Sequence, residues 1–184
     1  MNRFVMVLTL TLLLTPLSGC TGEEGDEVQS FPSFSAVADN NETYNNTRMA
    51  GGGYIVIFSA EWCNSPCYTT MHAIWAAQAE LPVLVMSTDP AENATGITLS
   101  EWHDSANAHD DEDANNDGTI DETEAGVTLT SYAFMKGSEV AKTLGITKPG
   151  SLAFVNGEGE LIYLHEGRMD NTEEITKYWN QANA

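Results

Sequence analysis

Basic residues are scarce in this sequence of 184 residues. Seven Lys and Arg stand against 27 Asp and Glu, so the formal net charge at pH 7 is −20. No Lys or Arg occurs between Arg48 and Lys136. Proteins bind nucleic acids through clustered Lys and Arg side chains that displace the counterions of the phosphates. The composition therefore argues against nucleic acid as a partner.

Cysteine is also rare, with three residues in the whole chain. Small secreted folds that depend on disulfides in place of a core carry more cysteines than this. Hydrophobic residues make up 42% of the sequence, which is enough to build a packed core and argues against a disordered acidic chain. The length fits one domain.

The longest run of apolar residues and threonines lies at the N terminus, over residues 4–14, and it can be extended to Leu17. It is short for a bilayer-spanning helix and fits a secretory signal. The run ends in LSGC, which resembles the lipobox of prokaryotic lipoproteins. In that family the signal is cleaved before the cysteine, which then carries a diacylglyceryl anchor. The resemblance implies a signal peptide over residues 1–19, lipidation of Cys20 and a lipid-anchored location at the cell membrane, facing outside the cytoplasm. The alternative is an ordinary export signal with a chance cysteine.

Apolar patterns after a Gly- and acid-rich tether, residues 20–30, predict one α/β domain over residues 31–184. Its elements should follow the order strand, helix, strand, helix, hairpin, helix, which is a three-layer arrangement. An irregular strand pair is expected before them, within residues 31–50. The expected strands are 54–59, 83–86, 151–155 and 161–165. One helix is expected to start with Ser65 as its N-cap and Pro66 in its first turn, and two more are expected over residues 139–144 and 171–183.

With Cys20 assigned to lipid, Cys63 and Cys67 remain as a pair in a compartment that permits disulfides. Cys67 lies in the first turn of the expected helix, where the helix dipole favours a thiolate. Residues four apart on a helix have Cβ atoms about 5–6 Å apart, whereas a disulfide needs roughly 3.5–4.5 Å. Cys63 must therefore precede the helix. Cys67 shares the apolar face of the helix, so we expect it to be buried and Cys63 to be exposed.

Residues 58–67, FSAEWCNSPC, resemble the active-site segment of thioredoxin-like proteins, with Trp62 before the first cysteine. The resemblance continues to residues 144–149, LGITKP, where the family has its cis-proline. Upstream, residues 31–41 resemble the N-terminal extension of extracytoplasmic TlpA-like members. The likeness covers most of the expected domain.

This resemblance implies a thioredoxin-like three-layer fold with a central mixed sheet, and thiol-disulfide oxidoreductase activity on protein thiols or disulfides without an organic cofactor. Cys63 would be the attacking thiol and Cys67 the resolving thiol. Pro149 would form the wall on the substrate side, and Trp62 would complete the active-site segment.

Three features depart from the family pattern. Three residues separate the cysteines where two are usual, and Ile57 stands where many thioredoxins bury an acid. Lys148 precedes the expected cis-proline, Pro149. If Pro149 packs against the pair, the Lys148 ammonium would stabilise a Cys63 thiolate; the alternative is a lysine that points into solvent.

Two other functions use the same cysteines. Thioredoxin-fold copper chaperones of the SCO type carry a CxxxC pair and a distant histidine, and thiolates are soft ligands that suit Cu(I). The chain has four histidines to consider; His72 is expected to point away from Cys67 by helical periodicity. The candidate histidines for copper are His72, His103, His109 and His165.

The remaining possibility is a calcium-stabilised interaction module whose disulfide is inert.

An acidic insertion over about residues 89–130 contains a twelve-residue stretch, 113–124, that matches the EF-hand calcium loop. Gly118 would make the sharp turn at the sixth position. The pattern predicts a structural Ca²⁺ ion; the alternative is a solvated acidic loop. The expected ligands are Asp113, Asn115, Asp117, the carbonyl of Thr119, Asp121 through water and a bidentate Glu124.

Overall fold

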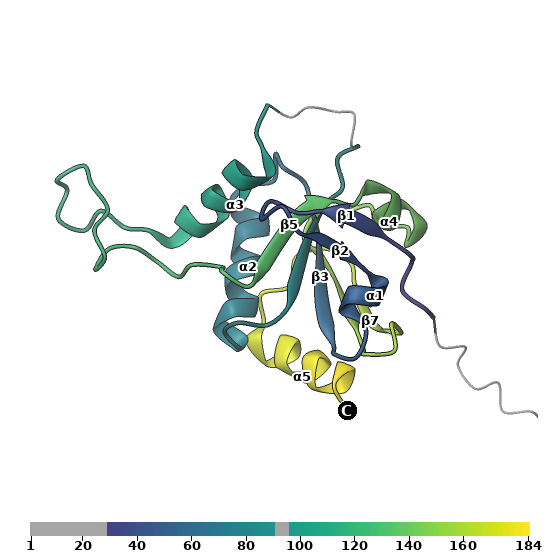
Figure 1. Ribbon diagram of the computed structural model, residues 1–184. Helices are drawn as coiled ribbons and strands as arrows, with labels where there is room; N and C mark the ends of the chain where they lie inside the picture. The colour runs from purple at the N-terminus through teal and green to yellow at the C-terminus, as the bar shows by residue number, and fades with distance from the viewer. Residues whose placement is uncertain (1–28, 91–95) are drawn as a thin grey trace, which may run out of the picture.

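The computed structural model describes residues 29–90 and 96–184 (Figure 1). The expected signal peptide, Cys20 and nearly all of the tether lie outside these residues. Within them, no helix combines the length and the apolar character that crossing a bilayer requires. In chain order the elements are β1 (Ser35–Val37), β2 (Thr43–Asn45), α1 (Asn46–Met49), β3 (Tyr54–Ser59), α2 (Ser65–Ala77), β4 (Val83–Ser87), α3 (Leu99–Asn107), the 3₁₀ helix η1 (Ala108–Asp110), β5 (Tyr132–Lys136), α4 (Ser138–Thr143), β6 (Ser151–Val155), β7 (Leu161–His165) and α5 (Thr172–Ala182).

A mixed sheet in the order β5-β4-β3-β6-β7 forms the middle layer. β3 pairs in parallel with β4, and β4 with β5, whereas β6 runs antiparallel to both β3 and β7. Every residue of β3, β4 and β6 is buried, as expected of apolar strands covered on both faces. The carboxyl ends of β3, β4 and β5 meet at one end of the sheet, and β6 starts at that same end.

Helices and a hairpin cover the two faces of this sheet (Figure 1). Successive side chains of β3 point to opposite faces. Ile55 and Ile57 pack in the core beneath α2, α3 and α5, together with the fully buried Trp102. Val56 and Phe58 belong to the second core, which α4 and the β1–β2 hairpin cover. The predicted three-layer α/β architecture is confirmed.

Two elements were not anticipated from the sequence. β5 provides an edge strand of the central sheet, and α3 lies inside the segment that reads as an acidic insertion. Thr98 and Glu101 cap the start of α3 reciprocally, side chain to backbone in both directions. Trp102 and Ala106, four residues apart on one face, are both fully buried. The part of the insertion that forms α3 therefore belongs to the core.

The expected N-cap of α2 is wrong by one residue. Asn64 holds the cap position, and its side chain makes no capping hydrogen bond. The Asn64 carbonyl accepts the N–H groups of both Cys67 and Tyr68, at 3.0 and 3.1 Å. Pro66 has no N–H to offer, so the first intrahelical hydrogen bonds start at Cys67.

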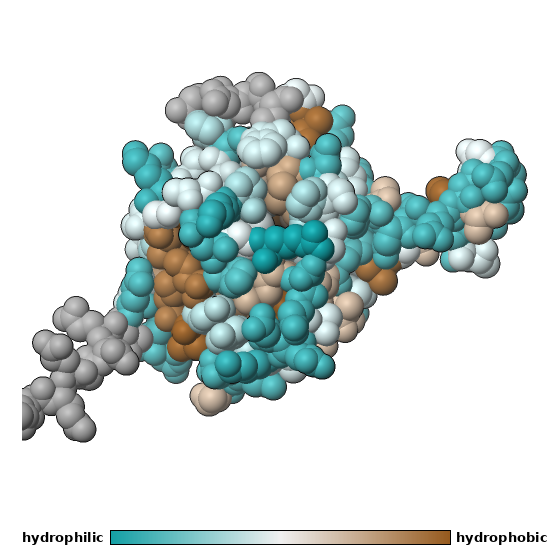
Figure 2. All heavy atoms as spheres, turned by 180° about the vertical axis from the view of Figure 1, so that it is seen from behind, coloured by the Kyte–Doolittle hydropathy of each residue, from teal (hydrophilic) through white to brown (hydrophobic). Residues whose placement is uncertain are grey.

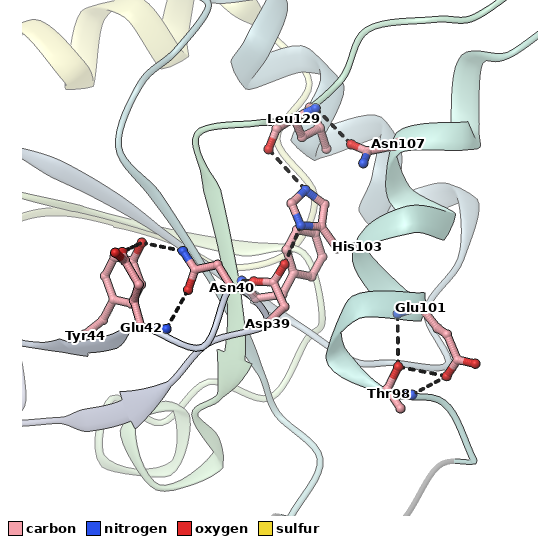
Figure 3. Close-up of polar contacts among 10 residues, drawn as sticks. Asp39, Asn40, Glu42, Tyr44, Thr98, Glu101, His103, Asn107 and Leu129 are labelled. Atoms are coloured by element: carbon pink, nitrogen blue, oxygen red, sulfur yellow. Dashed lines mark hydrogen bonds and ion pairs between the residues drawn. The ribbon is translucent and has the colours of Figure 1, made fainter.

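Asp39, in the turn between β1 and β2, holds the hairpin against β5 (Figure 3). Its main-chain N–H donates to the Phe134 carbonyl (2.9 Å), and its Oδ1 accepts the Phe134 N–H (2.8 Å). Its Oδ2 lies 2.7 Å from Nδ1 of His103 on α3, whose Nε2 lies 3.1 Å from the Leu129 carbonyl oxygen. The hairpin, the edge strand and α3 are thus joined at one carboxylate.

Residues 111–126 form an arm that projects from the body between α3 and β5 (Figure 1). Figure 2 shows that hydrophilic side chains cover most of it. Its two stems are joined where the Glu112 N–H donates to the Glu124 carbonyl (3.1 Å) and the Gly126 N–H donates to Asp111 Oδ1 (2.7 Å). The predicted calcium loop lies within this arm and is not flanked by a helix on its C-terminal side.

Candidate functional site

Cys63 and Cys67 form a disulfide directly after β3, with their Cα atoms 5.9 Å apart. The chain leaves β3 in a turn that closes with a hydrogen bond from the Cys63 N–H to the Ala60 carbonyl (2.9 Å). Cys67 is the third residue of α2 and is 1% exposed, whereas Cys63 is half-buried. The expected disulfide and the expected difference in burial are confirmed. A reaction partner can approach Cys63, while Cys67 is shielded.

Trp62, next to Cys63, is 65% exposed. A large aromatic side chain left in water next to a half-buried sulfur gives a partner protein an apolar surface to pack on, and aromatic residues are enriched at such contacts. The predicted site residue Trp62 therefore lies on the surface, beside the sulfur that a partner can reach.

Glu61, on the other side of Trp62, is buried at 4% exposure. Its Oε1 accepts a hydrogen bond from the Ser87 hydroxyl (2.8 Å) and pairs with the Lys136 ammonium. Sequence reasoning missed this residue because glutamate is almost never fully buried unless it is paired. Its partner Lys136 comes from β5, 75 positions away, and that strand was not anticipated either.

Pro149 lies at the same end of the sheet as the disulfide. The following Gly150 donates its N–H to the carbonyl of Phe58, near the end of β3 (2.7 Å). The expected cis-proline is wrong, because the described residues contain no cis peptide bond. Gly150 follows Pro149 with a φ of +92°, the arrangement of a type II turn in which Pro at the second position is trans.

Lys148 is well exposed and pairs with Glu166 at 3.3 Å. It therefore lies in solvent, as one of the two alternatives expected, but with an ion-pair partner that was not expected. The hydroxyl of Thr147 donates to the other oxygen of Glu166 (2.7 Å). This hydrogen bond, together with the Lys148 ammonium, holds the pKa of Glu166 below its ordinary value. Glu166 is therefore a carboxylate at neutral pH and offsets the charge of Lys148 beside Pro149.

No family model and no curated protein matches this chain. Solved structures do match it. A thio-disulfide isomerase from Thermus thermophilus aligns at a TM-score of 0.60 with 16% identity, over 85% of this chain and 96% of that one. An exposed lipoprotein thioredoxin from Streptococcus pneumoniae aligns at 0.54 with 17% identity, over 82% and 99%. A SCO1/SenC family lipoprotein from Bacillus anthracis aligns at 0.56 with 12% identity, over 85% and 96%.

The chain has a thioredoxin-like fold. At these identities the likeness establishes the architecture, and the residues of this chain must carry the argument for its activity. The thioredoxin-like fold places the Cys63–Cys67 disulfide at the carboxyl end of a central strand, where ligands and substrates of open α/β sheets bind. The neighbours include thiol-disulfide oxidoreductases as well as a SCO1/SenC family lipoprotein.

The four histidines of this thioredoxin-like domain have partners other than the cysteines. His72 contacts the Ala106 carbonyl (2.7 Å) and Asp110, which agrees with the expectation that it points away from Cys67. His109 contacts the Thr69 hydroxyl (3.3 Å). Burial, together with neighbouring His72, lowers the pKa of His109, against the opposing effect of Asp110. His103 pairs with Asp39, and His165 contacts the Arg168 carbonyl. Across residues 29–90 and 96–184, no three His, Cys, Asp or Glu side chains gather closely enough to hold a metal ion.

In the predicted calcium loop, backbone N–H groups donate to the carboxylates at both ends, Asp113 and Glu124. Asp113 accepts the N–H groups of Asp117 and Gly118 (3.1 and 3.0 Å), and Glu124 accepts that of Asn115 (3.0 Å). Gly118 has a φ of +86°, which suits the sharp turn expected there. The donors are hard oxygens of the kind that Ca²⁺ prefers, so the residues fit the ion in chemistry. In this structure backbone N–H groups hold the carboxylates, which do not converge on one point.

Hydroxyl groups of the loop keep two of its expected ligands ionised. The Thr119 hydroxyl donates to Asp117 (2.6 Å) and lowers the pKa of that carboxyl, and the Thr123 hydroxyl does the same for Asp121 (2.6 Å). Both groups therefore stay negatively charged to a lower pH than an ordinary aspartate. Carboxylates at this density repel one another.

Proposed function

We propose that this protein is a lipid-anchored thiol-disulfide oxidoreductase that acts on protein thiols or disulfides outside the cytoplasm. The observation that supports it best is the disulfide at the start of α2, which has one accessible sulfur beside an exposed tryptophan and one shielded sulfur. Attack and resolution need this division between the two sulfurs. A short four-residue loop contributes little stability as a cross-link, so a purely structural role explains its position poorly.

In the reduced enzyme, the Cys63 thiolate attacks one sulfur of a partner disulfide. A new S–S bond forms between Cys63 and that sulfur, the partner's own S–S bond breaks, and the leaving sulfur departs as a thiolate that takes up a proton. Cys67, as a thiolate, then attacks the Cys63 sulfur and releases the second partner thiolate. The enzyme ends with the Cys63–Cys67 disulfide, and two electrons have moved to the partner. Run in reverse, the same steps oxidise a partner dithiol.

A redox titration of the pair, run with and without Cu(I), tests this function. We expect a reduction potential between about −270 and −120 mV, the range of known exchange catalysts. The second candidate function, a copper-binding chaperone, is favoured by the two soft thiolates and by the likeness to a SCO-type lipoprotein. Under that function Cu(I) binds the reduced pair and protects it from oxidation. A pair that resists reduction and ignores copper would contradict both.

We also propose that the protein is anchored through Cys20, because the apolar N-terminal run is too short to hold it stably in a bilayer. Replacement of Cys20 by alanine is expected to release the protein from the membrane fraction, since a doubly acylated cysteine anchors where a single chain does not. Fractionation and mass spectrometry of the mature N terminus measure the outcome. An unmodified Cys20, or cleavage at another bond, would remove the anchor from the proposal.

The arm, we propose further, binds one Ca²⁺ ion through residues 113–124 with a structural role. Asp113 and Glu124 would hold the ion from opposite ends of the loop, and the ion would offset the repulsion between the carboxylates. Because the domain has no visible partner loop, the expected dissociation constant is weak, about 10⁻⁴–10⁻³ M, as in extracellular modules.

Calorimetry at millimolar Ca²⁺ should give binding heat for the wild type and no heat for Glu124→Gln. The matched control is Glu122→Gln, which removes the same charge from the tenth position of the loop, where no ligand is expected. This control should bind with an affinity within about threefold of the wild type. Equal losses in both variants would mean that general acidity attracts the ion, and no heat in the wild type would contradict the site.

A further inference from the structure

The base of the arm packs against α2 through a pair of histidines. η1, from which the arm leaves the body, contacts the helix that begins beside the disulfide (Figure 1). The centroid of the His109 ring lies 5.7 Å from that of Tyr68 and 5.3 Å from that of His72. The Nε2 of His109 is 3.3 Å from Thr69 Oγ1, whose own proton goes to the Ser65 carbonyl (2.8 Å). The Thr69 oxygen therefore accepts a hydrogen bond from the His109 ring.

Asp110 ties this contact to the returning stem of the arm. Its Oδ2 lies 3.3 Å from Nδ1 of His72 and accepts the N–H of Val127 (3.3 Å). Position 126 leaves no room for a side chain, because a Cβ there would overlap the Asp110 carboxylate. Gly126 thus lets this carboxylate lie against the stem while it faces α2. One side chain therefore connects both stems of the arm to the helix.

The hydrogen bonds of His72 determine where an added proton goes. The Ala106 carbonyl, 2.7 Å from Nε2, can only accept, so Nε2 carries the proton of the neutral ring. An added proton then binds Nδ1, the nitrogen that faces Asp110. The side chain of His72 is 13% exposed, so water screens this interaction only in part. The site can therefore hold one positive charge next to its carboxylate.

A second positive charge, on His109, would have to share that same carboxylate. Burial and the neighbouring His72 lower the pKa of His109, against the opposing effect of Asp110. Because the folded protein holds this pKa below its ordinary value, the contact is at full strength above that value and weakens as the pH falls below it. Two charged rings this close together repel one another.

The other groups at this contact stay uncharged between about pH 5 and pH 8. From α2 they are Thr69 and Tyr68; burial raises the pKa of Tyr68, against the smaller effect of a hydrogen bond with Ser105. From α3 they are the Ala106 carbonyl and the Ser105 hydroxyl. The charge at the contact is therefore set by the two histidines and Asp110.

We propose that His72, His109 and Asp110 form a pH-sensitive latch, which holds the base of the arm on α2 with one added proton and releases it when a second proton binds. The inference goes beyond the proposed exchange function and does not rest on it. Release frees the acidic arm to turn relative to the body. It also uncovers Tyr68, which is 6% exposed in the latched state and is the neighbour of Cys67.

Hydroxyl-radical labelling of the full-length protein, read on Tyr68 by mass spectrometry, tests the latch. The labelling rate of Tyr68 in the wild type should rise at least about fivefold between about pH 7.5 and pH 5. Tyr132, a tyrosine of the core that is 3% exposed, is the internal reference and should keep its rate. An equal rise at both tyrosines would mean general acid unfolding and would overturn the latch.

Three variants should respond in different directions. His109→Gln keeps an N–H for Thr69 and takes up no proton, so its ratio of rates between the two pH values should stay within about 1.5-fold of unity. His72→Gln removes the neighbouring charge and should move the rise to lower pH. Asp110→Asn keeps an acceptor for Val127 but removes the counter-charge, so the rise should begin at higher pH.

Matched controls separate the latch from general changes of charge. His165→Gln, at the end of β7, and Asp104→Asn, exposed on α3, remove the same groups elsewhere and should follow the wild type. An undiminished rise in His109→Gln, or shifts in the same direction for His72→Gln and Asp110→Asn, would contradict the proposal. If His109→Gln fails to fold, the opposed shifts of the other two variants decide the question.

Discussion

Replacing Cys63 by serine should abolish attack on disulfide substrates, with a loss of at least about 10³-fold in exchange rate, because a serine hydroxyl is a far weaker nucleophile than a thiolate. Cys67→Ser should instead trap a mixed disulfide on Cys63, since the shielded sulfur that resolves it is gone. The two residues differ in access, with Cys63 half-buried and Cys67 1% exposed. The measurements are exchange kinetics for the first variant and non-reducing electrophoresis for the second.

Alkylation of the reduced wild type provides the control for these roles. Cys63 should react first, because the reagent reaches it without any opening of α2. If Cys67 alkylates first, the assignment of attacking and resolving thiols is reversed. If both serine variants lose all activity without a trapped adduct, the pair works through a step other than two-stage exchange.

A second large effect is expected at Asp39, where replacement by alanine should lower the free energy of unfolding by about 2–5 kcal/mol, because two partly buried groups lose their hydrogen-bond partner. The ring of His103 contacts oxygen atoms through both of its nitrogens, the Asp39 carboxylate at Nδ1 and the Leu129 carbonyl at Nε2. The ring also stacks on Phe134, with centroids 4.3 Å apart. Asp39→Ala leaves His103 Nδ1 and the Phe134 N–H without the carboxylate that both contact (Figure 3).

Denaturant and thermal unfolding measure this loss, which corresponds to roughly 10 °C in melting temperature for a domain of this size. The matched control is Asp170→Ala, which breaks an exposed pair with Arg168 and should cost less than about 1 kcal/mol. Asp39→Asn, which keeps an acceptor oxygen, should fall between the two. A loss at Asp39→Ala no larger than the control would mean that water replaces the carboxylate.

The disulfide and the order of most elements could be predicted because the signals are local. The buried run of β3, Pro66 near the start of α2 and the four-residue spacing of the cysteines are read from one stretch of about fifteen residues. The features that were missed depend on distant partners. Glu61 is buried because Lys136 reaches it from another strand. The trans state of Pro149 depends on the turn that Gly150 completes.

α3 and β5 were missed for a different reason. The acidity of residues 89–130 hides a short helix with a reciprocal cap at Thr98 and Glu101, a signal that the sequence does contain. β5 is five residues long, and the turn before it, from Leu129 to Tyr132, contains no Gly, Pro, Asn or Asp that would mark it in the sequence, so the identity of β5 as a strand depends on its pairing with β4. For β5, tertiary context decided what the local pattern left open, whereas for α3 the local signal was present in the sequence.

Asp39 also affects how this protein behaves among its own copies. β5 ends the central sheet, and an open strand edge is a template for pairing with another molecule and hence for aggregation. At the middle of that edge, Asp39 forms hydrogen bonds with both the N–H and the carbonyl of Phe134. These are the groups that a neighbouring strand would otherwise pair with. At the opposite edge, Gln29 and Phe31 bond the chain at the start of β7. A strand of another copy would thus meet a capped edge at β5. Self-association by extension of the sheet is therefore less hindered along the remainder of β7.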